Sequence, residues 1–175
     1  MAENPSHAQL RAARSMTGEN QKALASRARV TESVLKLLES PHRKQPDPDN
    51  LKRVKAALEE KGIVFLPGTE NIGNGVRFAK PLETRSFTDF FRYARALLDL
   101  SIDEMATLSG VGRISLGRIE RGKLIRPPED VIEKIRQLIF DRGVTILPEE
   151  DDIGGGVRFR TSELLKTETK SSAGN

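Results

Sequence analysis

The sequence predicts a mostly α-helical protein built from two tandem copies of a four-to-five-helix unit, each followed by a short β-hairpin. Three observations predict this fold. A shift of 81 residues places residues 11–78 on residues 92–159 without a gap, and the run GVRF at 75–78 recurs at 156–159. Within each copy, apolar residues recur every three or four positions, which is typical of helices with one buried face. Each copy then ends in two β-branched or aromatic runs around a turn rich in Gly, Asn and Asp, which indicates a hairpin.

The second copy has the clearest helix signals. Ser101 and Glu104 have the spacing of a capping box, so a helix is expected to begin directly after Ser101. Gly110 is expected to end this helix, because glycine adopts the left-handed conformation at little cost. Pro128 suits the first turn of a later helix. The helices expected in this copy cover about 87–98, 102–108, 113–121 and 128–143.

The first copy repeats these signals. Asn20 and Thr31 are expected to cap its second and third helices, and the pair Asp47-Pro48 to open a fourth helix that Gly62 closes. The predicted units are 6–80, with a hairpin at 63–79, and 87–161, with a hairpin at 144–160. A linker is expected at 81–86. Residues 1–5 and 162–175 are expected to be disordered.

An isolated two-stranded hairpin is barely stable in water. The two hairpins are therefore expected to pair, and the sequence leaves two ways open. Pairing with each other would give a monomer with pseudo-twofold symmetry. Pairing with the hairpins of another chain would give a homodimer with four helical units.

Composition favours a soluble protein without catalytic equipment. The 175 residues include no cysteine, which excludes disulfides and thiolate metal sites. No secretory signal and no 18-residue apolar stretch is present, so a cytoplasmic location without membrane contact is expected. The net charge of +4 arises in the first copy: residues 1–81 have 14 Lys and Arg against 9 Asp and Glu, and residues 82–162 have 13 against 14. A basic excess suits a polyanionic partner.

No site for catalysis, a cofactor or a metal is expected. His7 and His42 have no Asp, Cys or second His at a useful spacing. Gly75 and Gly156 begin runs that resemble a nucleotide-binding loop, but the lysine of a P-loop does not follow. Both glycines are therefore interpreted as turn residues.

A family resemblance lies in residues 101–127, which read SIDEMATLSGVGRISLGRIERGKLIRP. This segment resembles the helix-turn-helix of phage repressors and Cro proteins, the xenobiotic-response-element-type class of bacterial regulators. The residues that carry the resemblance are Ala106, Gly110, Val111, Leu116, Ile119, Glu120, Gly122, Lys123, Arg126 and Pro127. The first copy matches more loosely, with Arg29 in place of the turn glycine and Pro41 in place of the glycine after the third helix.

The resemblance implies a set of base-reading residues on the third helix of each copy. In the family this helix enters the major groove. Arg113 would bind a guanine edge with two hydrogen bonds, Ile114 would pack on a thymine methyl group, and Glu32 would accept from a cytosine amine. The implied base-reading positions are Thr31, Glu32, Ser33 and Lys36 in the first copy and Gly112, Arg113, Ile114 and Arg118 in the second.

The resemblance also implies phosphate contacts and structural ion pairs. The family's backbone clamp at the start of the second helix is retained as Gln21, whereas Ile102 replaces it in the second copy. Residues in the loop after the third helix would contact phosphates, namely Arg43, Lys44, Lys123 and Arg126. The pairs Arg14–Glu39 and Arg95–Glu120 correspond to the ion pair between the first and third helices, which we interpret as structural.

These features predict a sequence-specific regulator of transcription that binds double-stranded DNA through two unlike recognition helices, about 32–38 and 113–121. Unlike helices should prefer unlike half-sites. The alternative is a protein-interaction regulator, such as an antiactivator or antitoxin, in which one or both units dock a polymerase subunit, an activator or a toxin. The loss of both expected glycines in the first copy, and Leu37 at its reading face, favour that alternative.

Overall fold

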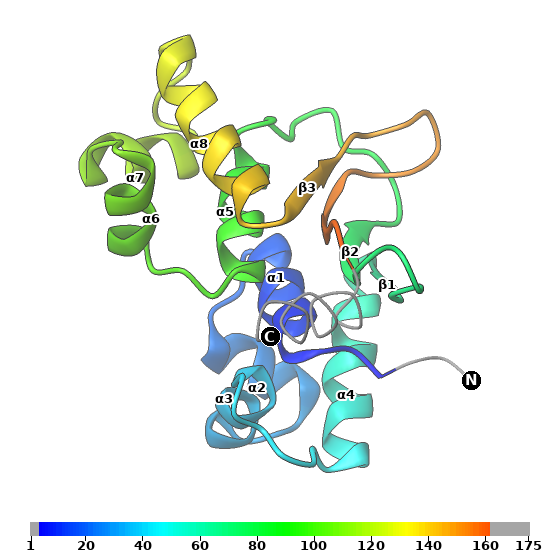
Figure 1. The fold of residues 1–175 in the computed structure, drawn as a ribbon. Helices are drawn as coiled ribbons and strands as arrows, with labels where there is room; N and C mark the ends of the chain where they lie inside the picture. The colour runs from blue at the N-terminus through cyan, green and yellow to red at the C-terminus, as the bar shows by residue number, and fades with distance from the viewer. Residues whose placement is uncertain (1–3, 162–175) are drawn as a thin grey trace, which may run out of the picture.

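A computed structural model describes residues 4–161. The described chain is mostly helical, with eight helices and four short strands (Figure 1). The order of the first six elements, four helices and two strands, recurs in the last six. The predicted disordered segment 162–175 lies outside the described residues, as do residues 1–3. The elements are α1 (His7–Thr17), α2 (Gln21–Ala28), α3 (Glu32–Glu39), α4 (Pro48–Glu59), β1 (Ile63–Leu66), β2 (Gly75–Phe78), α5 (Asp89–Leu97), α6 (Ile102–Ser109), α7 (Arg113–Glu120), α8 (Glu129–Asp141), β3 (Val144–Leu147) and β4 (Gly156–Phe159).

The predicted helix starts are confirmed where capping side chains were expected. Ser101 and Glu104 form a capping box: the Ser101 N–H donates to Glu104 Oε2 at 2.7 Å, and the Glu104 N–H donates to Ser101 Oγ at 3.1 Å. Asn20 accepts from the Ala23 N–H at the start of α2, and Thr31 accepts from the Val34 N–H at the start of α3. These bonds satisfy backbone donors that have no partner inside the helix.

The turn before the third helix keeps one backbone geometry in both halves. Gly110 ends α6 at φ 70°, and Arg29 ends α2 at φ 56°. A non-glycine residue with positive φ is uncommon, so the surrounding contacts must hold Arg29 there. The loss of the expected glycine therefore does not change the turn between α2 and α3.

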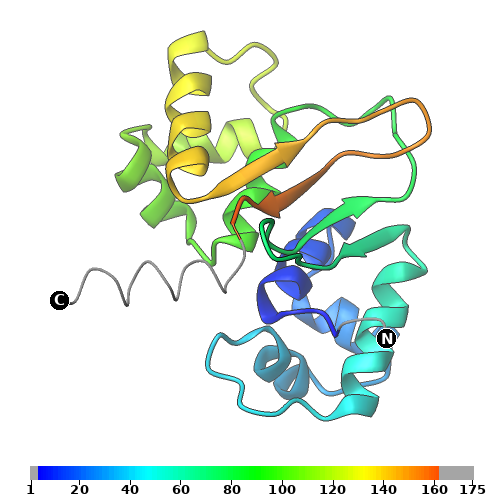
Figure 2. The ribbon, with the colours of Figure 1, turned by 45° about the vertical axis from the view of Figure 1, so that its right-hand side comes forward.

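The hairpins pair with each other within the chain. The antiparallel sheet has the strand order β1-β2-β4-β3, and β2 pairs with β4 through Val76 opposite Val157 (Figure 2). Both valines are fully buried. The outer edges of the sheet are therefore β1 and β3.

The interpretation of Gly75 and Gly156 as turn residues is wrong. Both are strand residues at the junction of β2 and β4, and neither has a positive φ. A Cβ atom on Gly156 would lie 2.2 Å from the Val76 carbonyl oxygen, and one on Gly75 would lie 2.5 Å from the Val157 carbonyl oxygen. These positions need glycine because two backbones approach closely there.

Helices α1 and α5 pack against each other at the centre of the molecule and join the two halves (Figures 1 and 2). Both helices carry small buried residues, Ala12 and Ala13 on α1 and Ala94 on α5. Tyr93 of α5 contacts Phe78 of β2 with ring centroids 5.9 Å apart, so the second half also packs on the first hairpin. The two units therefore share one hydrophobic core.

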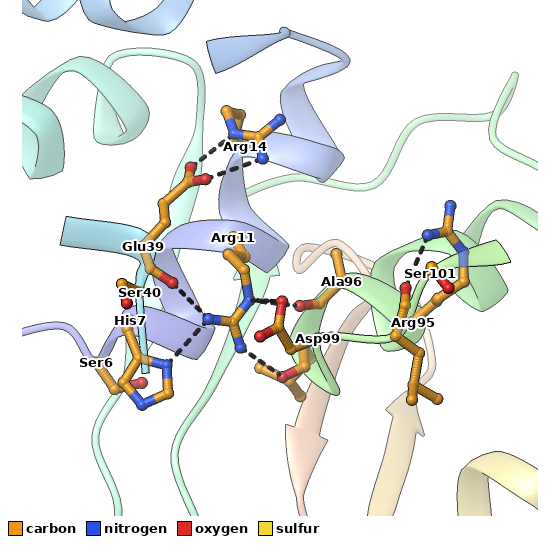
Figure 3. Close-up of polar contacts among 12 residues, drawn as sticks. Ser6, His7, Arg11, Arg14, Glu39, Ser40, Arg95, Ala96, Asp99 and Ser101 are labelled. Atoms are coloured by element: carbon orange, nitrogen blue, oxygen red, sulfur yellow. Dashed lines mark hydrogen bonds and ion pairs between the residues drawn. The ribbon is translucent and has the colours of Figure 1, made fainter. Parts of the chain in front are cut away.

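Arg11 crosses this junction (Figure 3). Its Nε donates to the Ala96 carbonyl at 3.2 Å and lies 3.2 Å from Asp99 Oδ1, while its NH1 donates to the Glu39 carbonyl at 2.6 Å. Burial lowers the pKa of Arg11, and the charges of Asp99 and Glu39 oppose that shift. Hydrogen bonds to main-chain carbonyls offset the free-energy cost of burying this charged group.

The N-terminal end differs from the prediction in one respect. Pro5 was assigned to a disordered end, yet it is buried, and its carbonyl accepts from Arg43 NH2 at 2.7 Å. Among residues 4–161, no helix is long and apolar enough to cross a membrane.

Candidate nucleic-acid interface

Helix α7 presents one exposed face and one buried face. Leu116 and Ile119 are fully buried and anchor the helix, whereas Arg113, Ile114 and Arg118 are exposed. Ile114 is 75% exposed, so an apolar side chain lies between two exposed arginines on this face. The exposed face is therefore available to a partner.

Arg113 forms an ion pair with Asp103 of the preceding helix α6. Both side chains are largely exposed, at 63% and 67%, so the pair adds little to stability. A partner with its own acceptors can displace Asp103 at small cost. The sequence analysis does not predict this ion pair. The opposite charges of Asp103 and Arg113 are the signal that could have indicated it.

The third helix of each half is tied to the first helix by a two-bonded ion pair. Arg95 Nε and NH2 donate to the two carboxylate oxygens of Glu120 at 2.7 and 2.8 Å. Arg14 makes the same two bonds to Glu39 at 2.6 and 3.0 Å (Figure 3). The Glu39 and Glu120 side chains are almost fully buried, so these pairs set the position of α3 and α7.

Part of the second half is similar to a known family. Residues 91–139 match the family described as Helix-turn-helix. The matched segment runs from α5 to α8 and contains α6, the turn at Gly110 and α7. The match supports DNA binding in the regulation of transcription. No curated protein and no solved structure matches the chain.

Helix α7 is the second helix of the helix-turn-helix within the matched segment. Gly117 lies on α7 between Ile114 and Arg118, but it is buried, and a Cβ atom there would lie 3.4 Å from Ile102 Cδ1. Ile102 stands where the family has a phosphate-binding glutamine, and its half-buried side chain instead packs under α7. The first turn of α6 therefore supports α7.

Helix α3 is the counterpart of α7 in the first half, and its exposed face has a different chemistry. Glu32 stands at the position of Arg113 and forms an ion pair with Lys36 at 3.1 Å. Lys22 stands at the position of Asp103, so the signs of both charges are reversed between the two halves. Leu37 is 60% exposed where α7 has Arg118. Ser33 is exposed, and the hydroxyl of Thr31 caps the helix.

The residues predicted to bind phosphate have different surroundings. Gln21 Nε2 donates to Glu39 Oε2 at 2.8 Å, which uses one of the two amide N–H donors. Lys44, Lys123 and Arg126 are exposed in the loops after α3 and α7. These three side chains have the accessibility that a phosphate contact needs, whereas Gln21 is half-buried.

Arg43, the remaining residue predicted to contact phosphate, also binds within the protein. Its NH1 donates to the Leu38 carbonyl at 3.1 Å, and its NH2 donates to the Pro5 carbonyl. Burial lowers the pKa of Arg43. The guanidinium group thus connects the loop after α3 to the N-terminal segment. The sequence does not predict this contact, because residues 1–5 are expected to be disordered.

The loops after the two third helices differ. Gly122 follows α7 with a φ of 64°, whereas Ser40 follows α3 in an extended conformation, with Pro41 next. The loop after α7 also contains Ile125, which is 91% exposed. The two halves thus present different shapes as well as different charges to a partner.

Proposed function

We propose that this chain is a sequence-specific transcriptional regulator that binds double-stranded DNA with two helix-turn-helix units, acting in the cytoplasm. The observation that carries the proposal is the exposed face of α7 within the matched segment: Arg113, Ile114 and Arg118 project from a helix that Leu116 and Glu120 anchor. A guanidinium, an aliphatic side chain and a second guanidinium on one face suit the acceptors and methyl groups of the major groove.

The second unit of this proposal is the α2–α3 segment. Its support is the shared element order, the shared turn geometry at Arg29 and Gly110, and the matching ion pairs of Glu39 and Glu120. In Figure 1, α7 lies at the upper left and α3 at the bottom of the molecule, both away from the sheet. Neither helix is covered by the sheet, so both are open to a DNA duplex.

The reversed charges at positions 32 and 113 support two unlike half-sites. Arg113 suits the acceptor-rich edge of guanine, whereas Glu32 suits the amine of cytosine. The α1–α5 packing and the β2–β4 pairing hold the two units together, so the distance between half-sites should vary little. One helical turn of DNA, about 34–36 Å or 10–10.5 base pairs, is the spacing expected for two units on one face.

Selection of binding sites from a random DNA pool with the full chain tests this proposal. We expect an enriched site with two unlike halves, bound by one chain, whose affinity falls steeply as the salt concentration rises. A perfectly palindromic site bound by a single chain would contradict two unlike readers. A palindrome bound by two chains would mean that one unit does the reading.

Replacing Arg113 with alanine should weaken binding to the selected site by about 1–3 kcal/mol and relax the base preference at one position. The physical reason is the loss of a two-bonded contact to one base. Fluorescence anisotropy on the selected duplex and on single-base variants measures both effects. Arg142→Ala is the matched control, because this exposed arginine follows α8 outside the α6–α7 unit. Equal losses for the two variants would indicate general charge attraction rather than base reading.

A second candidate function is the docking of a protein partner, and the exposure of Leu37 favours it. This side chain is 60% exposed on α3, at the position that Arg118 occupies on α7. An antiactivator or antitoxin that binds a polymerase subunit, an activator or a toxin would use such a surface. Leu37→Ala separates the two functions: unchanged DNA selection with lost regulation in cells would indicate a docking role for the first unit.

A homodimer through the hairpins stays a prediction. Because β2 and β4 pair with each other, such a dimer would have to use the outer strands β1 and β3. Sedimentation of the free chain and of its complex with DNA would test it.

A further inference from the structure

A pocket of about 380 Å³ lies where α1 and α5 meet, beside the C-terminal end of α1. Its lining is rich in arginine, with two arginines from each helix. Ser15 of α1 and Gly18, the residue directly after α1, also line the pocket. The four arginines are Arg11, Arg14, Arg92 and Arg95.

Three of these arginines have a carboxylate partner within the protein. Arg14 and Arg95 are bound by the buried carboxylates described above. Arg11 lies 3.2 Å from Asp99 and also donates to main-chain carbonyls at the end of α5. Their positive charges are therefore compensated before any ligand enters.

Arg92 is different. It forms no ion pair with any residue of the described range 4–161, and its buried Nε has no hydrogen-bond partner there. Its guanidinium carbon lies 5.3 Å from the centre of the Tyr93 ring. Burial raises the pKa of Tyr93, and a side-chain hydrogen bond with Arg92 opposes that shift, so Tyr93 offers Arg92 a neutral partner and no compensating charge. Glu19 also lines the pocket, but its carboxylate is bound by Arg27 at 2.7 Å. A buried donor on an uncompensated cation is costly without an acceptor.

The repeat explains why Arg92 lacks a carboxylate partner. Arg92 corresponds to Arg11, and the residue that corresponds to Asp99, the partner of Arg11, is Gly18. Gly18 and Asp99 have the same left-handed backbone, with φ of 73° and 58°. Glycine has no carboxylate, so Arg92 has no counterpart of the Arg11–Asp99 ion pair.

We infer that this pocket is an anion site, in which Arg92 binds a phosphate group in the place that a carboxylate at position 18 would take. A guanidinium fork matches the oxygen atoms of phosphate. The phosphate group can belong to a small phosphorylated metabolite or to the DNA backbone, and both offer the same chemistry to Arg92. The inference goes beyond the proposed function, because phosphate binding requires no DNA reading.

Titration of the full chain with inorganic phosphate, at constant ionic strength with chloride as the balancing anion, tests the site without DNA. The arginine Nε–H signals in a proton–nitrogen correlation spectrum report on it directly. We expect one such signal, lost in Arg92→Gln, to shift and saturate with phosphate. Removing a charged hydrogen-bond donor should weaken phosphate binding by roughly tenfold or more.

Gly18→Asp is the sharper variant, with Gly18→Asn as its matched control. A Cβ atom on Gly18 meets nothing within 4 Å, and Asp and Asn both tolerate the left-handed conformation. Aspartate at this position should pair with Arg92 and abolish the phosphate response. Asparagine has the same shape without the charge and should retain the response. The melting temperature of Gly18→Asp should also exceed that of Gly18→Asn.

The salt dependence of DNA binding distinguishes the two sources of phosphate. If the DNA backbone occupies the pocket, Arg92→Gln should lower the slope of affinity against salt by about one. If a small ligand occupies it, that slope should stay unchanged while the response to free phosphate is lost. The inference is overturned if Arg92→Gln changes neither response, or if Gly18→Asp binds phosphate as the wild type does.

Discussion

Replacing Gly156 with alanine is expected to lower the free energy of unfolding by about 3 kcal/mol. This is near the upper end of the usual cost of adding a methyl-sized group to a well-packed region. The new Cβ would lie 2.2 Å from the Val76 carbonyl oxygen and 2.6 Å from Arg77 Cβ. Backbone atoms cannot rotate away as a flexible side chain can, so β4 must move off β2. Urea denaturation followed by circular dichroism measures the loss.

Gly68→Ala is the matched control for this prediction. Gly68 lies in the loop of the first hairpin, where a Cβ atom would be 3.5 Å from the nearest atom, an ordinary contact. Its effect should stay within about 0.5 kcal/mol. An unchanged urea midpoint in Gly156→Ala would show that β2 and β4 do not approach as described. The hairpins would then have to be stabilised in another way, such as pairing between two chains.

Replacing Glu120 with glutamine is also expected to lower the free energy of unfolding by about 3 kcal/mol. The Glu120 side chain is only 4% exposed and receives both hydrogen bonds of Arg95. The amide preserves the shape but removes the charge, which leaves Arg95 part-buried and uncompensated. Because this pair holds α7 against α5, DNA affinity should fall together with stability. Thermal and urea unfolding, with anisotropy on the selected duplex, measure the two losses.

Two further variants show whether the effect belongs to the buried charge. Glu133→Gln removes an exposed carboxylate that lies 3.9 Å from Arg136, and it should change stability by less than about 0.5 kcal/mol. The double variant Arg95→Met with Glu120→Leu replaces both charges with apolar groups and should recover much of the loss. If Glu120→Gln were as stable as Glu133→Gln, the ion pair would have no structural role.

The local parts of the fold could be predicted from the sequence because they depend on neighbouring residues. Caps at Asn20, Thr31 and Ser101 act within three residues, and the structure has all three. The sequence also identified the segment around Gly110 that the family comparison matches. The turn at Arg29 was harder, because tertiary contacts override the local preference for glycine.

The candidate site could be predicted only in outline. The repeat register named Arg113 and Glu32 as equivalent, but it could not show that Asp103 pairs with Arg113. It predicts a phosphate contact for Arg43, but it could not show that this side chain also donates to the Leu38 and Pro5 carbonyls. A long side chain has several acceptors within reach, and only the folded chain selects among them.

By itself, the sequence determined the 81-residue repeat, the positions of most helices and which residues of α7 are exposed. These properties follow from periodicity and capping, which act over a few residues. The tertiary structure decided how the copies meet: β2 beside β4, Arg11 across to Asp99, and Arg92 facing Gly18 without a carboxylate. Contacts between residues about 80 positions apart depend on how the two units pack, and a one-dimensional register carries no information about that packing.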